Sequence, residues 1–310
     1  MVKLRTCSDE RYNAVRLAGI ELGGTKAIAV LADGDVVLDQ RIFPTREPGE
    51  TLGLLNTVLR QWHAEAALSG LGIASFGPVG VDPASSGYGT MLDTPKPMWS
   101  QVRIAEALTD GLTCPWLIDT DVNAAALAEY RRGSAIGCDS LCYITLGTGV
   151  GGGLVIGGRA VHGAMHPEIG HLRLRRAADD DFPGICRFHQ DCVEGLVSGP
   201  ALASRFAMEP GVIPSDHPTW QSVASDLGEL AACILLTTSA ERVVFGGGIS
   251  VKRPFLLPLI RRETVGRLGG YLPHINLVTA SSVIVSTSLN ENAGPLGALE
   301  LARTAAAGHL

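Results

Sequence analysis

The sequence predicts an α/β protein whose two domains face each other across a cleft. Strand pairs followed by alternating helices and strands occur once in the first 130 residues and again from about residue 139. A glycine-rich loop opens each of these two halves. The chain has 310 residues, of which 46% are hydrophobic, so it has enough apolar side chains for one large domain or two medium-sized ones.

The first half opens with three apolar runs between residues 17 and 43. The loop GGTK at 23–26 separates the first two runs, and an Asp-Gly turn at 33–34 precedes the third. Leucine, valine and tryptophan then recur at helical spacing over residues 49–68. We also expect a buried strand over 71–76, a helix over 104–112, a strand over 116–118 and an Ala-rich helix over 122–132.

The second half repeats this order from strands to helices. We expect consecutive strands over 141–146, 149–156 and 158–161, joined by glycine-rich turns. A long apolar helix over 226–239, a strand over 242–245 and a final helix over about 294–305 follow. No low-complexity linker separates the halves, so we expect them to pack directly against each other.

Charge and hydropathy argue against several classes of partner. A net charge of −6 does not favour binding to nucleic acid or to an anionic membrane. No run of about 18 uninterrupted apolar residues is present, so no membrane span is expected. The N-terminal 15 residues are polar and lack an apolar core, so we expect no signal peptide and a cytoplasmic location.

The cysteines and histidines predict a metal site. Cys186, His189 and Cys192 lie within seven residues, and His171 is fifteen residues upstream of Cys186. Two thiolates and two imidazoles suit tetrahedral Zn²⁺, and four protein ligands leave no open position, which indicates a structural ion. Incidental clustering is the alternative. The remaining thiols have no partner at ligand spacing and are expected to be plain cysteines: Cys7, Cys114, Cys138, Cys142 and Cys233.

Three glycine loops are candidate nucleotide-binding segments. The loops at 23–26 and 146–153 each join two expected strands, and their backbone N–H groups and threonine hydroxyls suit phosphate oxygens. Neither loop is a P-loop or a Rossmann loop, and tight hairpin turns are the alternative for each. The third loop, at 245–250, follows a strand and precedes a helix, which suits an adenosine, or only a crowded turn.

Polar residues after the strand at 116–118 are candidates for catalysis. Asp119 or Asp121 is placed to act as a general base at the carboxyl end of a strand. A helix N-cap is the alternative role for either carboxylate, and the residues alone do not choose between them. Further along, Glu168 and His171 in the sequence HPEIGH suit hydrogen bonds to sugar hydroxyls, and a polar loop in which His171 only ligates zinc is the alternative.

Taken together, these motifs resemble the ROK sugar kinases (repressor, open reading frame, kinase), and most of all the bacterial zinc-containing ROK fructokinases. The resemblance runs from about residue 17 to residue 305, and TPKPMW at 94–99 is the part that indicates fructokinase rather than glucokinase. The other motifs are GGTK at 23–26, FGP at 76–78, DTDVNAAA at 119–126, LGTGVGGG at 146–153, HPEIGH at 166–171, EGLVSGP at 194–200, FGGGIS at 245–250 and AGPLGALELA at 293–302.

The resemblance implies the actin-like ATPase (ribonuclease H-like) fold. It implies a small α/β domain of residues 1–120 with the C-terminal helix 291–310. The large domain would be residues 121–290, including a zinc-binding sugar loop at 162–197. The activity implied is ATP-dependent phosphorylation of a hexose, D-fructose to fructose 6-phosphate, by a cytoplasmic homodimer. Other readings are a kinase for glucose, mannose or an N-acetylhexosamine, a non-catalytic sugar sensor, and a zinc-dependent hydrolase.

Family matching also assigns roles to single residues. Asp121 would be the general base, and Glu168, His171 and Glu194 would bind the hexose. His171, Cys186, His189 and Cys192 would hold the structural Zn²⁺, while Mg²⁺ would accompany ATP. The phosphates would be held by Gly23, Gly24, Thr25, Lys26, Gly147, Thr148 and Gly149, and the adenosine by Gly246, Gly247 and Gly248.

The chain departs from the family pattern at four places. Glu21 stands where many members have Asp, although the fructokinase branch often carries Glu. Met98 and Gln190 each replace a usual glycine, and Arg187-Phe188 replaces the usual Pro-Tyr inside the zinc motif. No expected zinc ligand is lost. Only about sixteen residues precede the first expected strand, so we do not expect the N-terminal helix-turn-helix domain of the ROK repressors.

Overall fold

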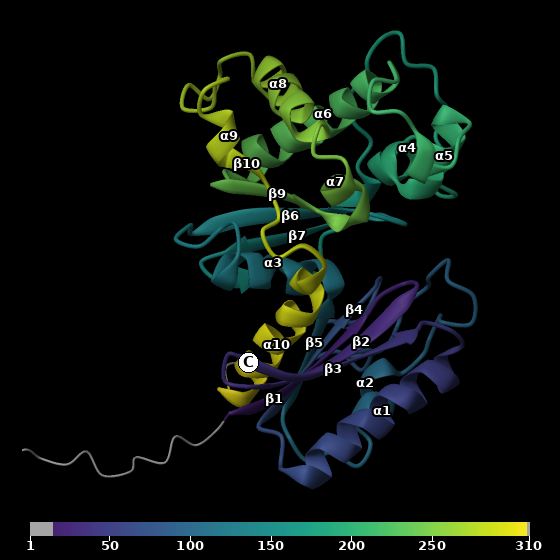
Figure 1. Ribbon diagram of the computed structural model, residues 1–310, viewed down its shortest axis with the longest axis vertical. Coiled ribbons are helices and arrows are strands. Elements are labelled where there is room, and N and C mark those ends of the chain that lie inside the picture. Colours follow the sequence, from purple (N-terminus) through teal and green to yellow (C-terminus); the bar gives the residue numbers. More distant parts are fainter. Residues whose placement is uncertain (1–14, 309–310) are drawn as a thin grey trace, which may run out of the picture.

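The computed structural model describes residues 15–308, which form two five-stranded sheets with helices on their faces (Figure 1). The first sheet has the strand order β3-β2-β1-β4-β5, and the second has the order β10-β9-β6-β7-β8. Cys7 and most of the N-terminal segment discussed above lie outside the described residues. None of the helices within 15–308 combines the length and apolar character needed to cross a membrane.

The first sheet follows the expected order of elements. Its antiparallel strands are β1 (Arg16–Leu22), β2 (Lys26–Asp33) and β3 (Val36–Pro44), and β4 (Gly70–Ser75) and β5 (Trp116–Thr120) extend it in parallel with β1. All residues of β4 are buried, because helices cover both of its faces. One face carries α1 (Pro48–Glu65) and α2 (Ile104–Thr109). The predicted apolar stripe of α1 is buried there: Leu52, Leu55, Val58, Leu59 and Trp62.

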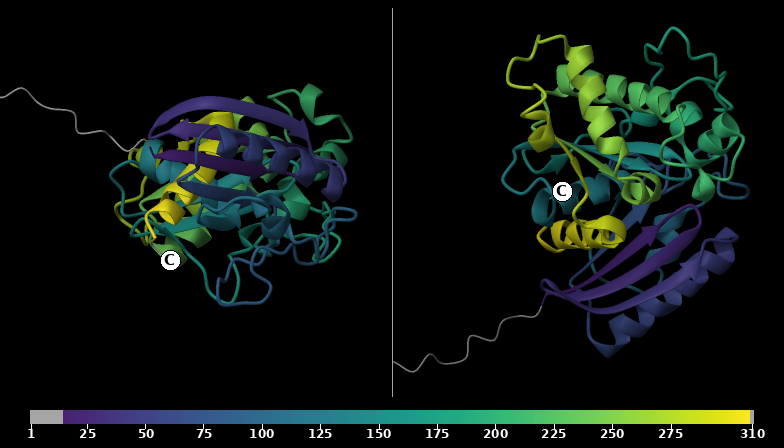
Figure 2. Two further views of the ribbon diagram at one scale, coloured as in Figure 1. Left: turned by 90° about the horizontal axis from the view of Figure 1, so that it is seen from below. Right: turned by 45° about the horizontal axis from the view of Figure 1, so that its top comes forward.

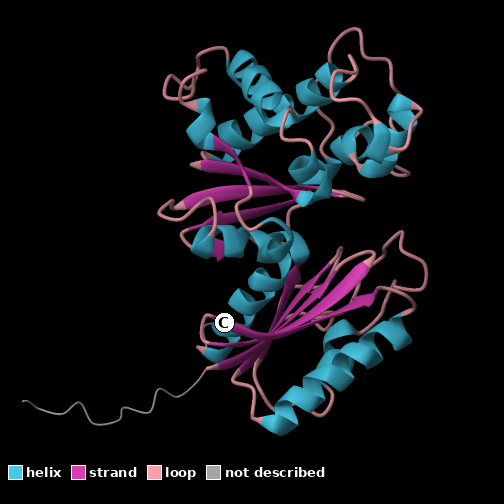
Figure 3. Cartoon of the chain, viewed as in Figure 1, coloured by secondary structure: helices cyan, strands magenta, loops and turns pink. Residues whose placement is uncertain are grey.

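The second sheet is built around β6 (Ser140–Leu146). It pairs with β7 (Val150–Ile156) and then the short β8 (Arg159–Ala160) on one side, and with β9 (Arg242–Gly246) and β10 (Ile284–Ser286) on the other. Figure 3 shows the long helices α6 (Trp220–Thr238) and α8 (Leu256–Leu268) on its outer face and α3 (Asp121–Arg132) on its inner face. The shorter helices are α4 (Val193–Val197), α5 (Gly199–Phe206), α7 (Gly247–Lys252) and α9 (Ala280–Val283).

The last helix, α10 (Ala293–Ala306), returns to the first sheet and packs between β4 and α3 (Figure 2). Glycine permits both contacts. A Cβ on Gly72 would lie 1.9 Å from the carbonyl oxygen of Ala298, and one on Gly297 would lie 2.1 Å from that of Ala124. Close helix–sheet and helix–helix packing therefore fixes the start of α3, the residue Asp121, where the two halves meet.

Candidate active site

A cavity of about 340 Å³ lies where the two halves meet, and it brings most of the predicted nucleotide-binding residues together. Its wall consists of the β1–β2 turn, the start of α3, the β6–β7 turn, α7 and the approach to α10. The predicted site residues that line it are Gly23, Thr25, Lys26, Asp121, Gly147, Gly247 and Gly248. The adjoining positions Gly24, Thr148, Gly149 and Gly246 are not in this wall.

The structure separates the roles of the two aspartates on either side of Thr120. Asp119 is buried and accepts hydrogen bonds from the Thr120 amide at 2.7 Å and from the Asn123 side chain at 2.8 Å. Thr120 is the N-cap of α3, because its hydroxyl accepts from the Asn123 amide at 3.2 Å. The side chain of Asp121 instead lines the cavity. Asp121 is therefore the carboxylate available to a ligand.

Glu21 is a cavity residue that the sequence did not identify as part of the site. It lies on β1 next to Asp121, with its carboxylate against Gly294 at the start of α10. Burial raises the pKa of Glu21 to about 7, although Lys26 opposes the shift. One oxygen, Oε2, is buried without a hydrogen-bond partner. An unpaired carboxylate oxygen beside the candidate phosphate-binding loops fits Mg²⁺, which prefers hard oxygen ligands.

Asp121 has an electrostatic environment suited to proton transfer. Burial raises its pKa to about 7, and the neighbouring charges of Glu21 and Glu168 add to this shift. A general base is most effective when its pKa is near the working pH. The Asp121 carboxylate is therefore poised between its ionised and protonated forms around neutrality.

The predicted sugar-binding carboxylates lie beside these residues. Glu194 Oε2 accepts from the Val150 amide at 3.1 Å, directly behind the β6–β7 glycine loop. Burial, followed by the charge of Glu194, raises the pKa of Glu168 to about 7. His166, which the sequence did not single out, is buried beside Glu168, with Nδ1 3.4 Å from Oε1. These groups form a polar wall adjacent to Asp121.

The four predicted metal ligands converge. Their ligand atoms all lie within 4.8 Å of one another. His171 Nδ1 is 3.8 Å from Cys186 Sγ and 3.6 Å from Cys192 Sγ, and His189 Nδ1 is 3.8 Å from Cys186 Sγ. Tetrahedral zinc with its usual bond lengths places nitrogen and sulfur ligands about 3.6 Å apart. The residues therefore fit Zn²⁺, and His171 keeps Nε2 free for another partner.

Two of the departures from the family pattern retain a glycine-like backbone. Met98 has φ 67° and Gln190 has φ 56°, both in the left-handed region that side-chain-bearing residues rarely adopt. Both positions are those where the family usually has glycine. The backbone of the TPKPMW segment and of the metal loop is thus kept, at some conformational cost, while a side chain is added.

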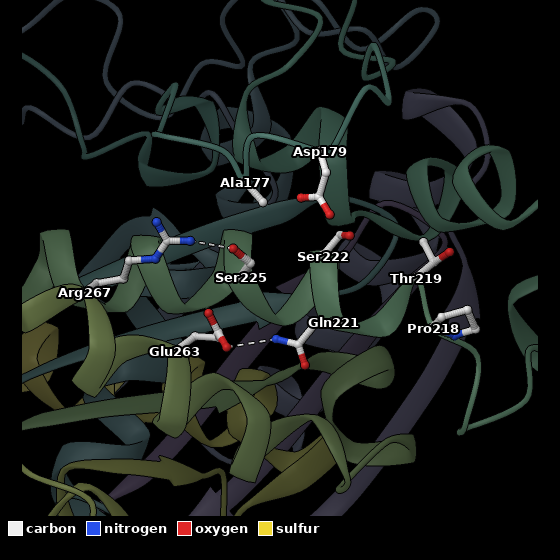
Figure 4. Close-up of a pocket in the computed structure, with 9 residues that line it drawn as sticks. All are labelled: Ala177, Asp179, Pro218, Thr219, Gln221, Ser222, Ser225, Glu263 and Arg267. Atoms are coloured by element: carbon white, nitrogen blue, oxygen red, sulfur yellow. Dashed lines mark hydrogen bonds between the residues drawn. The ribbon is translucent and has the colours of Figure 1, made fainter.

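A second cavity, of about 460 Å³, lies away from these residues between Ala177–Asp179 and the helices α6 and α8 (Figure 4). Four of its polar groups are paired: Arg267 donates to Ser225 at 2.6 Å, and Gln221 donates to Glu263 at 2.8 Å. It contains none of the predicted site residues. The cavity at the junction of the halves is therefore the candidate active site.

Comparison with known proteins places this architecture in a family. The chain is 37% identical to the fructokinase of Zymomonas mobilis over 92% of this chain and 96% of that protein. It is 35% identical to the fructokinase of Pediococcus pentosaceus over 93% of this chain and 98% of that protein. The crystal structure of a ROK hexokinase from Thermus thermophilus superposes with a TM-score of 0.73 at 26% identity, covering 93% and 98% of the two chains.

The sequence pattern that defines the ROK family matches residues 17–305, almost the whole described part of the chain. The resemblance carried by the sequence motifs is thereby confirmed, and so is the predicted α/β fold with the actin-like ATPase architecture. The chain belongs to the ROK family.

Proposed function

We propose that the protein transfers the γ-phosphoryl group of ATP to the 6-hydroxyl of D-fructose, giving fructose 6-phosphate and ADP. The observation that carries the proposal is the position of Asp121. Its carboxylate lines the same cavity as the three glycine loops, and Glu168 is close enough to raise its pKa. Relatives named fructokinase that align over nearly the whole chain support this choice of hexose.

The chemistry needs little from the protein beyond positioning and charge. The loops at 23–26 and 147–149 hold the phosphates, and Gly246, Gly247 and Gly248 lie beside the adenosine. Asp121 accepts the proton as the hydroxyl oxygen bonds to the γ-phosphorus and the bond from that phosphorus to the ADP oxygen breaks. Glu21 would help to hold Mg²⁺, which would neutralise phosphate charge when bound.

The hexose is held by Glu168, Glu194 and the free Nε2 of His171. Carboxylates accept hydrogen bonds from vicinal hydroxyls, and the imidazole offers a further polar contact. Four protein ligands would leave a bound Zn²⁺ no open coordination position, so the ion would fix this loop rather than take part in the reaction. Homodimer formation and a cytoplasmic location remain predictions from the family resemblance.

A panel of hexoses tests the proposed substrate. D-Fructose is expected to give the highest kcat/KM in an assay of ADP release, ahead of glucose, mannose and N-acetylhexosamines. Direct detection of the sugar phosphate separates transfer from ATP hydrolysis. Equal or higher kcat/KM on glucose would contradict the fructose assignment but leave the kinase assignment intact. Release of ADP at the same rate without any sugar would reject both.

The pH dependence of the reaction follows from the raised pKa of Asp121. Protonation removes the base, so kcat/KM for the hexose is expected to fall as the pH drops through about 7. The decrease would begin well above the ordinary range for an aspartate. A rate that stays constant between pH 7 and pH 5 would show that ionisation of Asp121 does not limit the reaction.

A further inference from the structure

His162 links the start of the sugar loop, residues 162–197, to the end of β5 in the other sheet. Its Nε2 lies 2.9 Å from Oδ2 of Asp119 and 3.4 Å from the side-chain nitrogen of Asn123. Asp119 is almost completely buried, whereas the His162 side chain is 37% exposed. The contact therefore joins a loop of the second half to the buried carboxylate that precedes the candidate base.

The other oxygen of Asp119 holds the backbone and side chain on both sides of Asp121. Oδ1 accepts from the Thr120 amide at 2.7 Å and from the Asn123 side chain at 2.8 Å. The position of Asp119 consequently sets the path of the chain through Asp121. Because His162 occupies the opposite oxygen, it limits the rotation of the Asp119 carboxylate.

Residues 162–168 of the sugar loop contact the first half at a second point. His166 Nε2 accepts from the Val79 amide at 3.3 Å, and its Nδ1 faces Glu168. Residues 162–168 are thus attached to the first half both at Asp119 and at Val79. The contact at Asp119 lies two residues before the candidate base, Asp121. The contact at Val79 is made by His166, which lies beside the candidate sugar-binding residue Glu168.

We propose that His162 is a positioning residue for phosphoryl transfer, which through Asp119 fixes the general base Asp121 relative to the sugar-binding carboxylate Glu168. The inference rests on the proposed function, and no direct contact of His162 with substrate is implied. Phosphoryl transfer depends steeply on the alignment of the attacking hydroxyl, so a loosened base–sugar geometry lowers the rate.

A positive charge on His162 strengthens its hydrogen bond to the Asp119 carboxylate. The hydrogen bond with Asp119 raises the pKa of His162, so the imidazolium form persists to higher pH than in a free histidine. A charge-assisted hydrogen bond to a buried carboxylate is stronger than a neutral one. Asp119 on β5 is the titratable group that raises the pKa of this imidazole, and the charge of His162 in turn lowers the pKa of His166 on the same loop.

Three variants test the proposal. His162→Ala removes the donor, and His162→Gln keeps an amide donor near the position of Nε2 without a titratable ring. His63→Ala is a matched control, because His63 is also half-buried and accepts a hydrogen bond, at 3.2 Å from the Leu68 amide, but lies on α1. Steady-state kinetics with the preferred hexose and amide hydrogen exchange of the ligand-free proteins are measured for each.

His162→Ala is expected to lower kcat/KM for the hexose roughly tenfold or more, as loss of a hydrogen bond to a charged group would, with KM for ATP little changed. Exchange is expected to accelerate at residues 120–123 and 162–168. His162→Gln should recover most of both properties. If His162→Ala matches His63→Ala in kinetics and in exchange, the proposal is overturned. If the wild-type protein phosphorylates no hexose, the proposed function is rejected instead. In that case, unchanged amide exchange in His162→Ala would independently reject the role of the His162–Asp119 contact in holding residues 120–123.

Discussion

Asp121→Asn is expected to lower kcat by about a hundredfold or more while the hexose still binds, because general-base catalysis typically contributes that much. The amide keeps the size and hydrogen-bonding shape of the carboxylate but does not accept the proton of the attacking hydroxyl. Turnover is measured by sugar-phosphate formation and hexose affinity by calorimetry. Near-normal turnover would remove Asp121 from the role of base.

Asp119→Asn is the matched control, because the two aspartates are two residues apart and differ in environment. Asp119 is buried among three hydrogen-bond donors, so its loss should reduce thermal stability as well as rate. Asp121 is crowded by the like charges of Glu21 and Glu168. Asp121→Asn is therefore expected to leave the melting temperature unchanged or to raise it. A large loss of stability in Asp121→Asn would indicate a structural role.

The strands and helices that the sequence predicts correctly are those with strong periodicity. The stripe from Leu52 to Trp62 identifies α1, and the two apolar runs around the first glycine loop identify β1 and β2. Helix α8 was not predicted, although Leu256, Ile260, Thr264 and Leu268 are buried at a spacing of four. Pro258 in its first turn reads as a helix breaker, and Thr264 is polar at a core position.

Elements set by tertiary pairing leave a weaker mark in the sequence. Strand β10 has three residues, too few for periodicity, and exists because it pairs with β9. The strand expected over 158–161 is shorter than predicted, at Arg159–Ala160, because only two residue pairs connect it with β7. In both cases the neighbouring strand, rather than the local sequence, determines the length.

In the candidate site, too, some features are visible in the local sequence and others arise only from tertiary packing. The glycine loops are visible in the sequence because phosphate binding requires close backbone approach. The residues alone do not choose between Asp119 and Asp121, because an N-cap and a general base use the same residue type. The family resemblance selects Asp121, and the structure gives the cap to Thr120. Glu21 and Glu291 are nearly the whole chain apart in sequence, yet both line the cavity, a proximity that only the packing of α10 creates.

Removal of the metal is expected to lower thermal stability and hexose affinity together, with a smaller effect on ATP binding. Zinc would tie His171 to Cys192, and α4 begins immediately after Cys192 with Val193 and Glu194. The Val193 amide donates to the Leu172 carbonyl at 3.0 Å, so the residues that follow His171 and Cys192 are also held together. Without the ion, the two buried thiols of Cys186 and Cys192 and the two imidazoles lose their common partner, and the free energy of binding is lost from folding.

Cys192→Ser tests this coupling without a chelator, and Cys114→Ser is the control for loss of a thiol outside the metal cluster. Cys192→Ser should lower the melting temperature by several degrees, weaken hexose binding and reduce the zinc content measured by elemental analysis. Cys114→Ser should keep its full zinc content and hexose affinity. The structural-zinc assignment fails if complete metal removal changes neither stability nor sugar binding. The assignment also fails if metal removal abolishes turnover while stability and sugar binding stay intact, because that result would place an open, catalytic ion in the cluster.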